Sequence, residues 1–237
     1  MKGKYIAVGA GVCADLITIR GVNALRDADV ILYDRLADET LLENVDAEKI
    51  FVGKTPYSHS ITQEEINNIL RERLKKGERV VRLKGGDSLI FSRVAEEIAV
   101  AKESGAQTEI VPGVTSASSA MARAGCPLTD RISASGVIFI TGHCKDGEPE
   151  YNWKMMLDNG FTLAIYMGLK NINKIADNLM NNGADKNTPS LIADCVEQPD
   201  EKLISCTLES LSENSMKCRG PAVFIVGRTL KSVREKI

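Results

Sequence analysis

The chain has 237 residues, of which 43% are hydrophobic and 26% are charged, a balance that excludes wholesale disorder and allows one large domain or two small ones. Its 30 Lys and Arg against 32 Asp and Glu leave a net charge of −2, which argues against a general nucleic-acid-binding role. No apolar run approaches the roughly 20 residues of a membrane-spanning helix, so we expect no membrane partner.

Short apolar runs alternate with helical patterns through the first half of the chain. Continuous runs of this kind are typical of parallel strands that are covered on both faces. A helical pattern with Val22, Leu25 and Ala28 on one face follows the first run, and another covers 95–102. This alternation predicts a parallel sheet with right-handed crossovers, whose five strands lie at 5–8, 30–33, 50–52, 79–83 and 108–111.

The clearest helical signal begins at Thr62. Thr62 and Glu65 have the spacing of a capping box, in which each side chain satisfies a free amide at the helix start. Gly77 can adopt the left-handed conformation that ends a helix. We therefore predict a helix between Thr62 and Gly77, whose apolar residues recur at helical spacing: Ile66, Ile69, Leu70 and Leu74.

Glycine or polar residues follow each predicted strand of the first half. The carboxyl ends of parallel strands meet at one edge of a sheet, where ligands of such folds bind. We therefore expect a ligand site formed by Gly9-Ala10-Gly11, Asp34, Lys54, Gly85-Gly86-Asp87 and Pro112-Gly113.

The second half has a different pattern. Polar stretches and one clear helix, at 172–182, separate its apolar runs. We expect a second α/β domain with a mixed sheet, with strands at 137–141, 163–166, 191–195 and 223–226. The domain boundary is expected within 112–116. This gives an N-terminal domain over 1–114 with a mainly parallel sheet and a C-terminal domain over 115–237.

The cysteine pattern favours reduced thiols in a cytoplasmic protein. No two cysteines form a C-x-x-C pair, and the chain has only two histidines, so no zinc or other metal site is expected. The six cysteines are Cys13, Cys126, Cys144, Cys195, Cys206 and Cys218.

Two glycine loops leave two interpretations open. The loop from Gly9 to Ala14, with Asp34 at the end of the next strand, fits a dinucleotide fingerprint and allows an NAD-dependent oxidoreductase. The alternative is a tight turn in which glycine permits close backbone approach. Gly85-Gly86-Asp87 can cradle a polar cofactor through amides and a carboxylate, or Asp87 can simply cap a helix.

Taken together, a series of short motifs resembles the tetrapyrrole methylase family. Each motif is short, but their order and spacing run through almost the whole chain and are specific. They include Val8-Gly9-Ala10-Gly11, Tyr33-Asp34-Arg35-Leu36, Gly53-Lys54, Arg82-Leu83-Lys84-Gly85-Gly86-Asp87, Val111-Pro112-Gly113-Val114-Thr115-Ser116-Ala117, Pro127-Leu128-Thr129 with Arg131, Thr141-Gly142-His143 and Tyr166-Met167-Gly168.

The resemblance implies two α/β domains with S-adenosylmethionine in the cleft between them, usually in a homodimer. The first glycine loop is then expected to line the tetrapyrrole site and not to hold a pyrophosphate. Met167 has an alternative role as a flexible core residue. Motif by motif, the cofactor contacts fall on Gly85, Gly86, Asp87, Ile90, Thr115, Ser116 and Met167.

The activity that the resemblance implies is methylation of uroporphyrinogen III at C2 and C7 to give precorrin-2, in siroheme or cobalamin biosynthesis. One alternative is methylation of a later corrinoid precursor by the same fold. Another is a catalytically impaired paralogue that binds the tetrapyrrole or the cofactor. The last alternative is an NAD-dependent oxidoreductase.

The resemblance also implies residues for proton transfer. Asp34 and Lys54 match the positions of a proton acceptor and a proton donor. Arg93 and Glu96 are further catalytic candidates, although their spacing also suits a surface ion pair on a helical turn.

The implied substrate is rich in carboxylates, which Arg binds through two nitrogens. Arg35, Arg131 and His143 are the expected substrate-binding residues, and His59 is a further candidate for the same site. The alternatives are a solvated surface charge for each Arg and a hydrogen bond within its own loop for each His.

The chain also departs from the family pattern. Val12-Cys13-Ala14-Asp15 and Ser88 stand where the family has proline-containing segments, and Ser92, Val94 and Ala95 stand at its glycines. The family's Asn-Gly-Thr is absent around Asp194-Cys195-Val196. We expect these changes to alter loop stiffness and backbone approach more than the fold.

Overall fold

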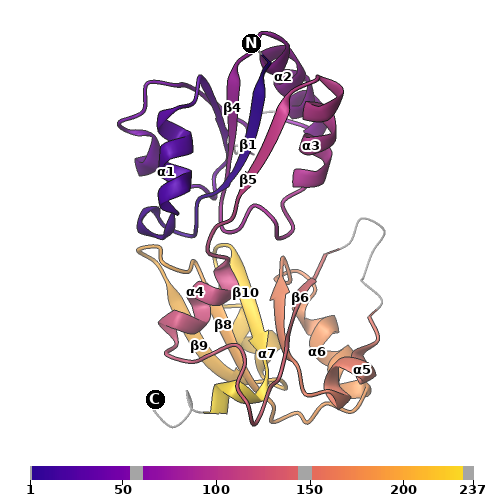
Figure 1. The fold of residues 1–237 in the computed structure, drawn as a ribbon. Helices are drawn as coiled ribbons and strands as arrows, with labels where there is room; N and C mark the ends of the chain where they lie inside the picture. The colour runs from indigo at the N-terminus through magenta and orange to yellow at the C-terminus, as the bar shows by residue number, and fades with distance from the viewer. Residues whose placement is uncertain (1, 54–60, 144–150, 232–237) are drawn as a thin grey trace. The chain divides into compact units, whose positions relative to one another are not determined.

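The computed structural model describes residues 2–53, 61–143 and 151–231 (Figure 1). The chain divides into two compact units, Met1–Thr115 and Ser116–Ile237, here called unit 1 and unit 2. Each unit contains one five-stranded sheet and its own helices.

The sheet of unit 1 is parallel throughout and confirms the prediction for the first half. Its strand order is β3-β2-β4-β1-β5. Each strand lies within two residues of its predicted bounds. The strands are β1 (Lys4–Gly9), β2 (Val30–Tyr33), β3 (Glu48–Phe51), β4 (Arg79–Lys84) and β5 (Gln107–Val111).

Helices cover both faces of this sheet, as Figure 1 shows. Tyr5 and Ala7 of β1 are buried on the face that packs against α2 (Gln63–Lys75) and α3 (Val94–Glu103). Ile6 and Val8 are buried on the opposite face, with α1 and the short helix η2. Since alternate residues of each strand are buried on opposite faces, the strands read as continuous apolar runs. The bounds are Ile19–Arg26 for α1, Ala14–Leu16 for η1 and Glu39–Leu42 for η2.

Helix α2 begins and ends where the sequence predicts. The Glu65 amide donates to Thr62 Oγ1 at 3.2 Å and the Thr62 amide donates to Glu65 Oε2 at 2.6 Å, which completes the capping box. Gly77 has φ of 85° and follows the helix end. The expected face of α1 is only partly right, because the helix ends at Arg26 and Ala28 lies beyond it.

The sheet of unit 2 is mixed, as predicted, with strand order β6-β7-β10-β8-β9. β6 and β7 are parallel and the remaining neighbours are antiparallel. The strands are β6 (Val137–Thr141), β7 (Thr162–Tyr166), β8 (Pro189–Asp194), β9 (Lys202–Thr207) and β10 (Ala222–Val226). β9 was not predicted.

The core of unit 2 lies between its sheet and the helices packed against it. Ile165 and Phe224 of the sheet are fully buried, together with Leu179 of α6 and Leu211 of α7. Only α6 was predicted among the helices of this unit. The helices are α4 (Ser116–Arg123), α5 (Trp153–Asp158), α6 (Ile172–Asn181), α7 (Leu211–Ser215) and the short η3 (Arg228–Leu230). Within the described ranges, no helix has both the length and the apolar character needed to cross a membrane.

Candidate functional site

The strand ends of unit 1 pack backbone against backbone. The Gly11 amide donates to the Gly86 carbonyl at 3.1 Å and the Gly86 amide donates to the Gly11 carbonyl at 2.7 Å. A Cβ on Gly9 would lie 2.6 Å from the Gly113 nitrogen, so these loops approach too closely for any side chain there. The ends of β1, β4 and β5 therefore form one tightly packed edge, as the sequence predicts.

This packing favours the tight-turn interpretation of the first glycine loop. The Ala10 amide donates to the Lys84 carbonyl at 2.8 Å, and the Gly11 amide donates to Gly86 as described. A dinucleotide fold instead offers the amides of this turn to a pyrophosphate. Since two of these amides already have partners within the protein, the geometry argues against an NAD site at this loop.

Asp34 lies directly after β2 and both of its carboxylate oxygens are engaged. Oδ1 accepts from the Leu36 amide at 3.1 Å, and Oδ2 lies 2.9 Å from Nη2 of Arg82. The Asp34 side chain is half-buried, whereas the neighbouring Arg35 is exposed. Two further candidates of this edge, Lys54 and His59, lie outside the described residues.

The second glycine loop forms a tight turn after β4. Gly86 has φ of 68°, and a Cβ on Gly85 would lie 2.5 Å from the carbonyl oxygen of Leu36. Asp87 Oδ1 accepts from the Leu89 amide at 2.9 Å, and the Ile90 amide donates to the Asp87 carbonyl at 3.2 Å. Asp87 therefore caps a turn with one carboxylate oxygen, while its other oxygen has no hydrogen bond within the described chain.

The two serines that depart from the family pattern are accommodated in this loop. Ser88 is fully buried and its hydroxyl donates to the Val111 carbonyl at 3.0 Å. The Ser92 hydroxyl donates to the Ser88 carbonyl. Ser92, Val94 and Ala95 all have negative φ, so their replacement of glycine adds no left-handed strain. The strained non-glycine positions here are instead Phe91 and Arg93, with φ of 49° and 59°.

Arg93 and Glu96 form a two-point ion pair at the start of α3. Nε and Nη2 of Arg93 each lie 2.7 Å from an oxygen of Glu96. Hydrogen bonds from Arg93 lower the pKa of Glu96, and the same bonds raise the pKa of Arg93. Both side chains are about half exposed, so the structure shows the solvated surface ion pair, and the catalytic role of Arg93 and Glu96 stays a prediction.

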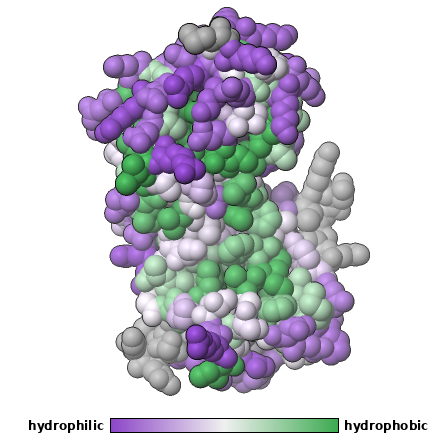
Figure 2. All heavy atoms as spheres, viewed as in Figure 1, coloured by the Kyte–Doolittle hydropathy of each residue, from purple (hydrophilic) through white to green (hydrophobic). Residues whose placement is uncertain are grey.

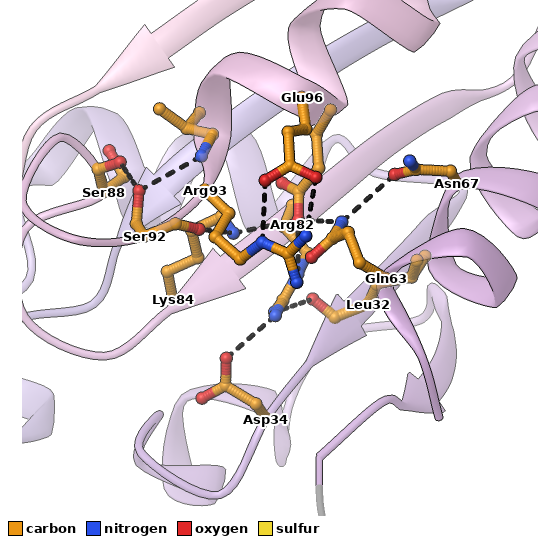
Figure 3. Close-up of polar contacts among 12 residues, drawn as sticks. Leu32, Asp34, Gln63, Asn67, Arg82, Lys84, Ser88, Ser92, Arg93 and Glu96 are labelled. Carbon is orange, nitrogen blue, oxygen red and sulfur yellow. Dashed lines mark hydrogen bonds and ion pairs between the residues drawn. The ribbon is translucent and has the colours of Figure 1, made fainter. Parts of the chain in front are cut away.

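The sequence analysis missed a buried charged cluster beside Asp34 (Figure 3). Glu97 has no exposed surface, and the side chains of Arg82 and Lys84 are only 6% exposed. Glu97 Oε1 lies 2.9 Å from Lys84 Nζ and 3.5 Å from Arg82 Nε, while Oε2 accepts from the Tyr5 hydroxyl at 2.6 Å. The available signal was the pair of basic residues at alternate positions of a covered parallel strand, because such charges require a buried partner.

Apolar side chains accompany these polar groups on the surface of unit 1. In the view of Figure 2, they gather over the half of this unit where its parallel strands end. The exposed large hydrophobics of the loops after β2 and β4 are Leu36, Leu89 and Phe91. A mixture of apolar surface and a few convergent polar groups is typical of a small-molecule site.

In unit 2, the ends of β6 and β7 hold further candidates. Met167 follows β7, is 52% exposed and has φ of 53°, so its side chain is not part of the core as the alternative proposed. The Tyr166 hydroxyl lies 3.3 Å from the Ala117 amide, next to Ser116 at the start of α4. His143 is exposed, and its amide and carbonyl both bond to the Thr141 hydroxyl. Thr115, half-buried, is the last residue of unit 1.

Arg131 lies elsewhere in unit 2. It is exposed in a loop before β6 that Asp130 closes by accepting hydrogen bonds from Ile132, Ser133 and Ala134. The Ser133 carbonyl packs 3.7 Å from a Cβ placed on Gly160, just before β7 begins. The structure therefore places Arg131 near the amino ends of these strands, away from the edge of Met167 and His143.

The remaining departure, around Cys195, introduces a strained residue. Cys195 is buried with φ of 51°, a conformation that favours glycine. Burial and the Asp194 carboxylate raise the pKa of Cys195, so its thiol stays protonated at neutral pH. Among the residues that the structure describes, no group of three or more His, Cys, Asp or Glu side chains is placed to hold a metal ion.

The chain is similar to known proteins over most of its length. The family model of tetrapyrrole (corrin/porphyrin) methylases matches residues 4–212. The uroporphyrinogen-III C-methyltransferase of Bacillus subtilis is 41% identical over 234 residues, which cover 96% of this chain and 91% of that protein. The chain spans about half the length of the siroheme synthases that it matches, for example 49% of the one from Zymomonas mobilis.

Two solved structures share the fold over nearly their whole length. A cobalt-precorrin-4 methyltransferase has a TM-score of 0.86 at 28% identity, with 96% of each chain covered. A uroporphyrin-III C-methyltransferase from Thermus thermophilus, complexed with S-adenosylhomocysteine, has a TM-score of 0.80 at 32% identity, with 97% of this chain and 94% of that one covered. The family match and these likenesses show that the chain belongs to the tetrapyrrole methylases.

Proposed function

We propose that this protein transfers methyl groups from S-adenosylmethionine to C2 and C7 of uroporphyrinogen III and releases precorrin-2. The observation that carries the proposal is the 41% identity with the Bacillus subtilis uroporphyrinogen-III C-methyltransferase across 91% of that protein's length. The Thermus thermophilus structure with S-adenosylhomocysteine supports the choice of cofactor.

The proposed cofactor residues have the chemistry that S-adenosylmethionine requires. The cofactor supplies a methyl group on a sulfonium, which is a good leaving group. Asp87 keeps one carboxylate oxygen available for a hydroxyl or ammonium group. Met167 presents an exposed apolar side chain suited to a flat ring. We assign to this role Gly85, Gly86, Asp87, Ile90, Thr115, Ser116 and Met167.

The proposed proton-transfer residues act on the tetrapyrrole and not on the cofactor. Methylation of a substituted pyrrole carbon leaves a cation, which is neutralised when a base removes a proton from elsewhere on the macrocycle, and such base catalysis contributes about 10²–10⁴-fold. Asp34 is our proposed acceptor, because Arg82 and the Leu36 amide hold its carboxylate in one orientation. Lys54 is proposed as the donor, and Arg93 with Glu96 as a second pair for this step.

The proposed substrate-binding residues are Arg35, Arg131 and His143. Exposed guanidinium groups can bind the carboxylates of the tetrapyrrole through two nitrogens. Arg35 and His143 follow strand ends, as a ligand site of this fold requires. Arg131 rests on its sequence motif, since it lies at the other end of its own sheet.

The setting of the reaction is also part of the proposal. The names of the longer relatives favour siroheme biosynthesis as the pathway that uses the product. We further propose a homodimer, from the family resemblance, and a place in the cytoplasm, from the cysteine pattern that favours reduced thiols.

An anaerobic incubation with uroporphyrinogen III and S-adenosylmethionine, followed by mass spectrometry, tests this function. The expected product carries two added methyl groups. Cofactor binding without methylation would favour an impaired binding protein. Methylation of a later corrinoid precursor instead would favour the second candidate activity, which the likeness to the cobalt-precorrin-4 methyltransferase supports.

A further inference from the structure

Of the buried charges of unit 1, the proposed function has so far used only the contact of Arg82 with Asp34. Arg82 and Lys84 lie on β4, at the centre of a sheet that is covered on both faces, and Glu97 lies on α3. Charges in such a place cost several kcal/mol unless they are paired, and apolar residues of similar volume are often as stable. The cluster therefore calls for a reason beyond stability.

Arg82 connects this cluster with Asp34. Its Nη1 donates to the carbonyls of Leu83 at 2.7 Å and Leu32 at 3.4 Å, which orients the guanidinium. Its Nε has no hydrogen bond among the described residues and forms an ion pair with Glu97 Oε1 at 3.5 Å. Nη2 then lies 2.9 Å from Asp34 Oδ2 (Figure 3). Leu32 and Arg82 are paired across β2 and β4, so Asp34, two residues further along the chain and just after β2, lies within reach of this side chain.

Glu97 anchors Arg82 and is itself held from several sides. Its Oε2 accepts from the buried Tyr5 hydroxyl at 2.6 Å, and its Oε1 accepts from Lys84 at 2.9 Å and from Gln63 Nε2 at 3.3 Å. Lys84 also donates to the Ser92 carbonyl at 2.7 Å, in the loop that leads to Arg93. Residues of β1, α2 and β4 therefore hold the Glu97 side chain of α3 in place.

We propose that Arg82 is a positioning residue that holds the Asp34 carboxylate for proton transfer, and that Glu97 is the anchor that fixes Arg82. The inference rests on the proposed function, because Asp34 is the proton acceptor only in that reaction. Arg82 itself is almost completely buried, so it acts through Asp34 and does not touch the substrate.

The Arg82→Lys variant tests this role. Lysine keeps the buried charge beside Glu97 but is shorter and lacks the fork that reaches Asp34. We expect kcat to fall roughly tenfold to a hundredfold, as misplacement of a reacting group by about 1 Å does. The Michaelis constants for both substrates should stay within about twofold, because the ligand-binding residues are unchanged.

Arg79→Lys is the matched control. Arg79 lies on the same strand, but its guanidinium pairs with Asp27 at the surface, 3.3 Å away. This variant should keep wild-type kcat and a similar melting temperature. If Arg82→Lys folds normally and also keeps wild-type kcat, the positioning role is wrong.

A double-mutant cycle separates positioning from general stability. In an Asp34→Asn background, Arg82→Lys should lower kcat no further, because its effect passes through Asp34. Independent, additive losses would overturn the proposal.

A crystal structure of the Arg82→Lys variant tests the positioning role without any measurement of enzyme activity. The Asp34 carboxylate should leave its position in the native fold while the β2 and β4 backbones stay in place. An Asp34 carboxylate that stays in its native position would contradict the positioning role. Inactivity of the wild-type protein on uroporphyrinogen III is a different outcome, and it would count against the proposed function alone.

Discussion

The hydroxyl of Tyr166 accepts a hydrogen bond from the amide of Ala117 at 3.3 Å, which joins the end of β7 to the start of α4. The residues next to this contact are Met167 and Ser116, two candidates that lie 51 positions apart in the sequence. The first amides of a helix are otherwise unsatisfied and attract negative charge. The contact therefore ties the strand end that precedes Met167 to α4, the helix that begins with Ser116.

We predict that Asp87→Ala weakens binding of S-adenosylhomocysteine roughly tenfold, because a charged hydrogen bond contributes about 1.5–3 kcal/mol. Isothermal titration calorimetry measures this affinity. Asp46→Ala, which removes an exposed carboxylate from another loop, should bind the ligand like the wild type. Equal affinities for the two variants would remove Asp87 from the proposed site.

Arg35→Ala and Arg131→Ala are each expected to raise the Michaelis constant for uroporphyrinogen III by roughly tenfold, with kcat little changed. Loss of a contact that is equally strong in ground state and transition state has this signature. Arg219→Ala is the control, since its side chain is exposed and only its backbone amide bonds to Asp194. Arg131 lies near the amino ends of β6 and β7, away from Met167 and His143. Normal kinetics for Arg131→Ala alone would therefore leave Arg35 as the one of these two arginines that binds the substrate.

The Gly85→Ala variant should unfold at a lower urea concentration and bind S-adenosylhomocysteine less tightly. Its new Cβ would lie 2.5 Å from the Leu36 carbonyl oxygen, so one of the two loops must shift, at a cost of about 1–3 kcal/mol. Gly105→Ala is the comparison, because that site has positive φ but nothing within 4 Å. It should be destabilised without any loss of ligand affinity. A Gly85→Ala protein with unchanged affinity would mean that this loop does not form the site.

The loop of Arg131 should make folding sensitive to acid. Hydrogen bonds from Ser133 lower the pKa of Asp130 from its usual 3.8 to about 2. Since the folded-state pKa is the lower one, the stabilisation is complete above pH 3.8 and is lost as the pH falls towards 2. The melting temperature of Asp130→Asn should therefore fall less than that of the wild type as the pH is lowered from 3.8 towards 2. Asp177→Asn, at an exposed carboxylate of α6, should keep the wild-type curve, and identical curves for all three proteins would contradict the assignment.

Local signals account for the elements that the sequence predicted. The capping box at Thr62 and the continuous apolar runs of unit 1 depend only on neighbouring residues and on burial of both faces. β9 was missed because it is an edge strand of mixed polar and apolar sequence, Lys202–Thr207, in which only Cys206 is buried. α4 was missed because alanine and serine dominate it and leave little apolar periodicity, although its buried face includes Ala117 and Ala120.

The candidate site was predictable only in part, for a similar reason. Strand order brings the ends of β1, β2, β4 and β5 together, and glycines mark those ends, so Asp34 and the Gly85–Asp87 turn were found from the sequence. The cluster of Arg82, Lys84 and Glu97 joins a strand to a helix that follows it, and sequence spacing does not reveal which charges will meet in a core. The position of Arg131 likewise depends on a loop whose course no local pattern describes.

The most direct test of the central claim uses S-adenosylmethionine labelled with ¹³C in its methyl group. After anaerobic reaction with uroporphyrinogen III, carbon NMR of the product should show two labelled methyl groups, attached at C2 and C7. Label at any other carbon, or no transfer by a folded protein that binds S-adenosylhomocysteine, would contradict the proposed reaction.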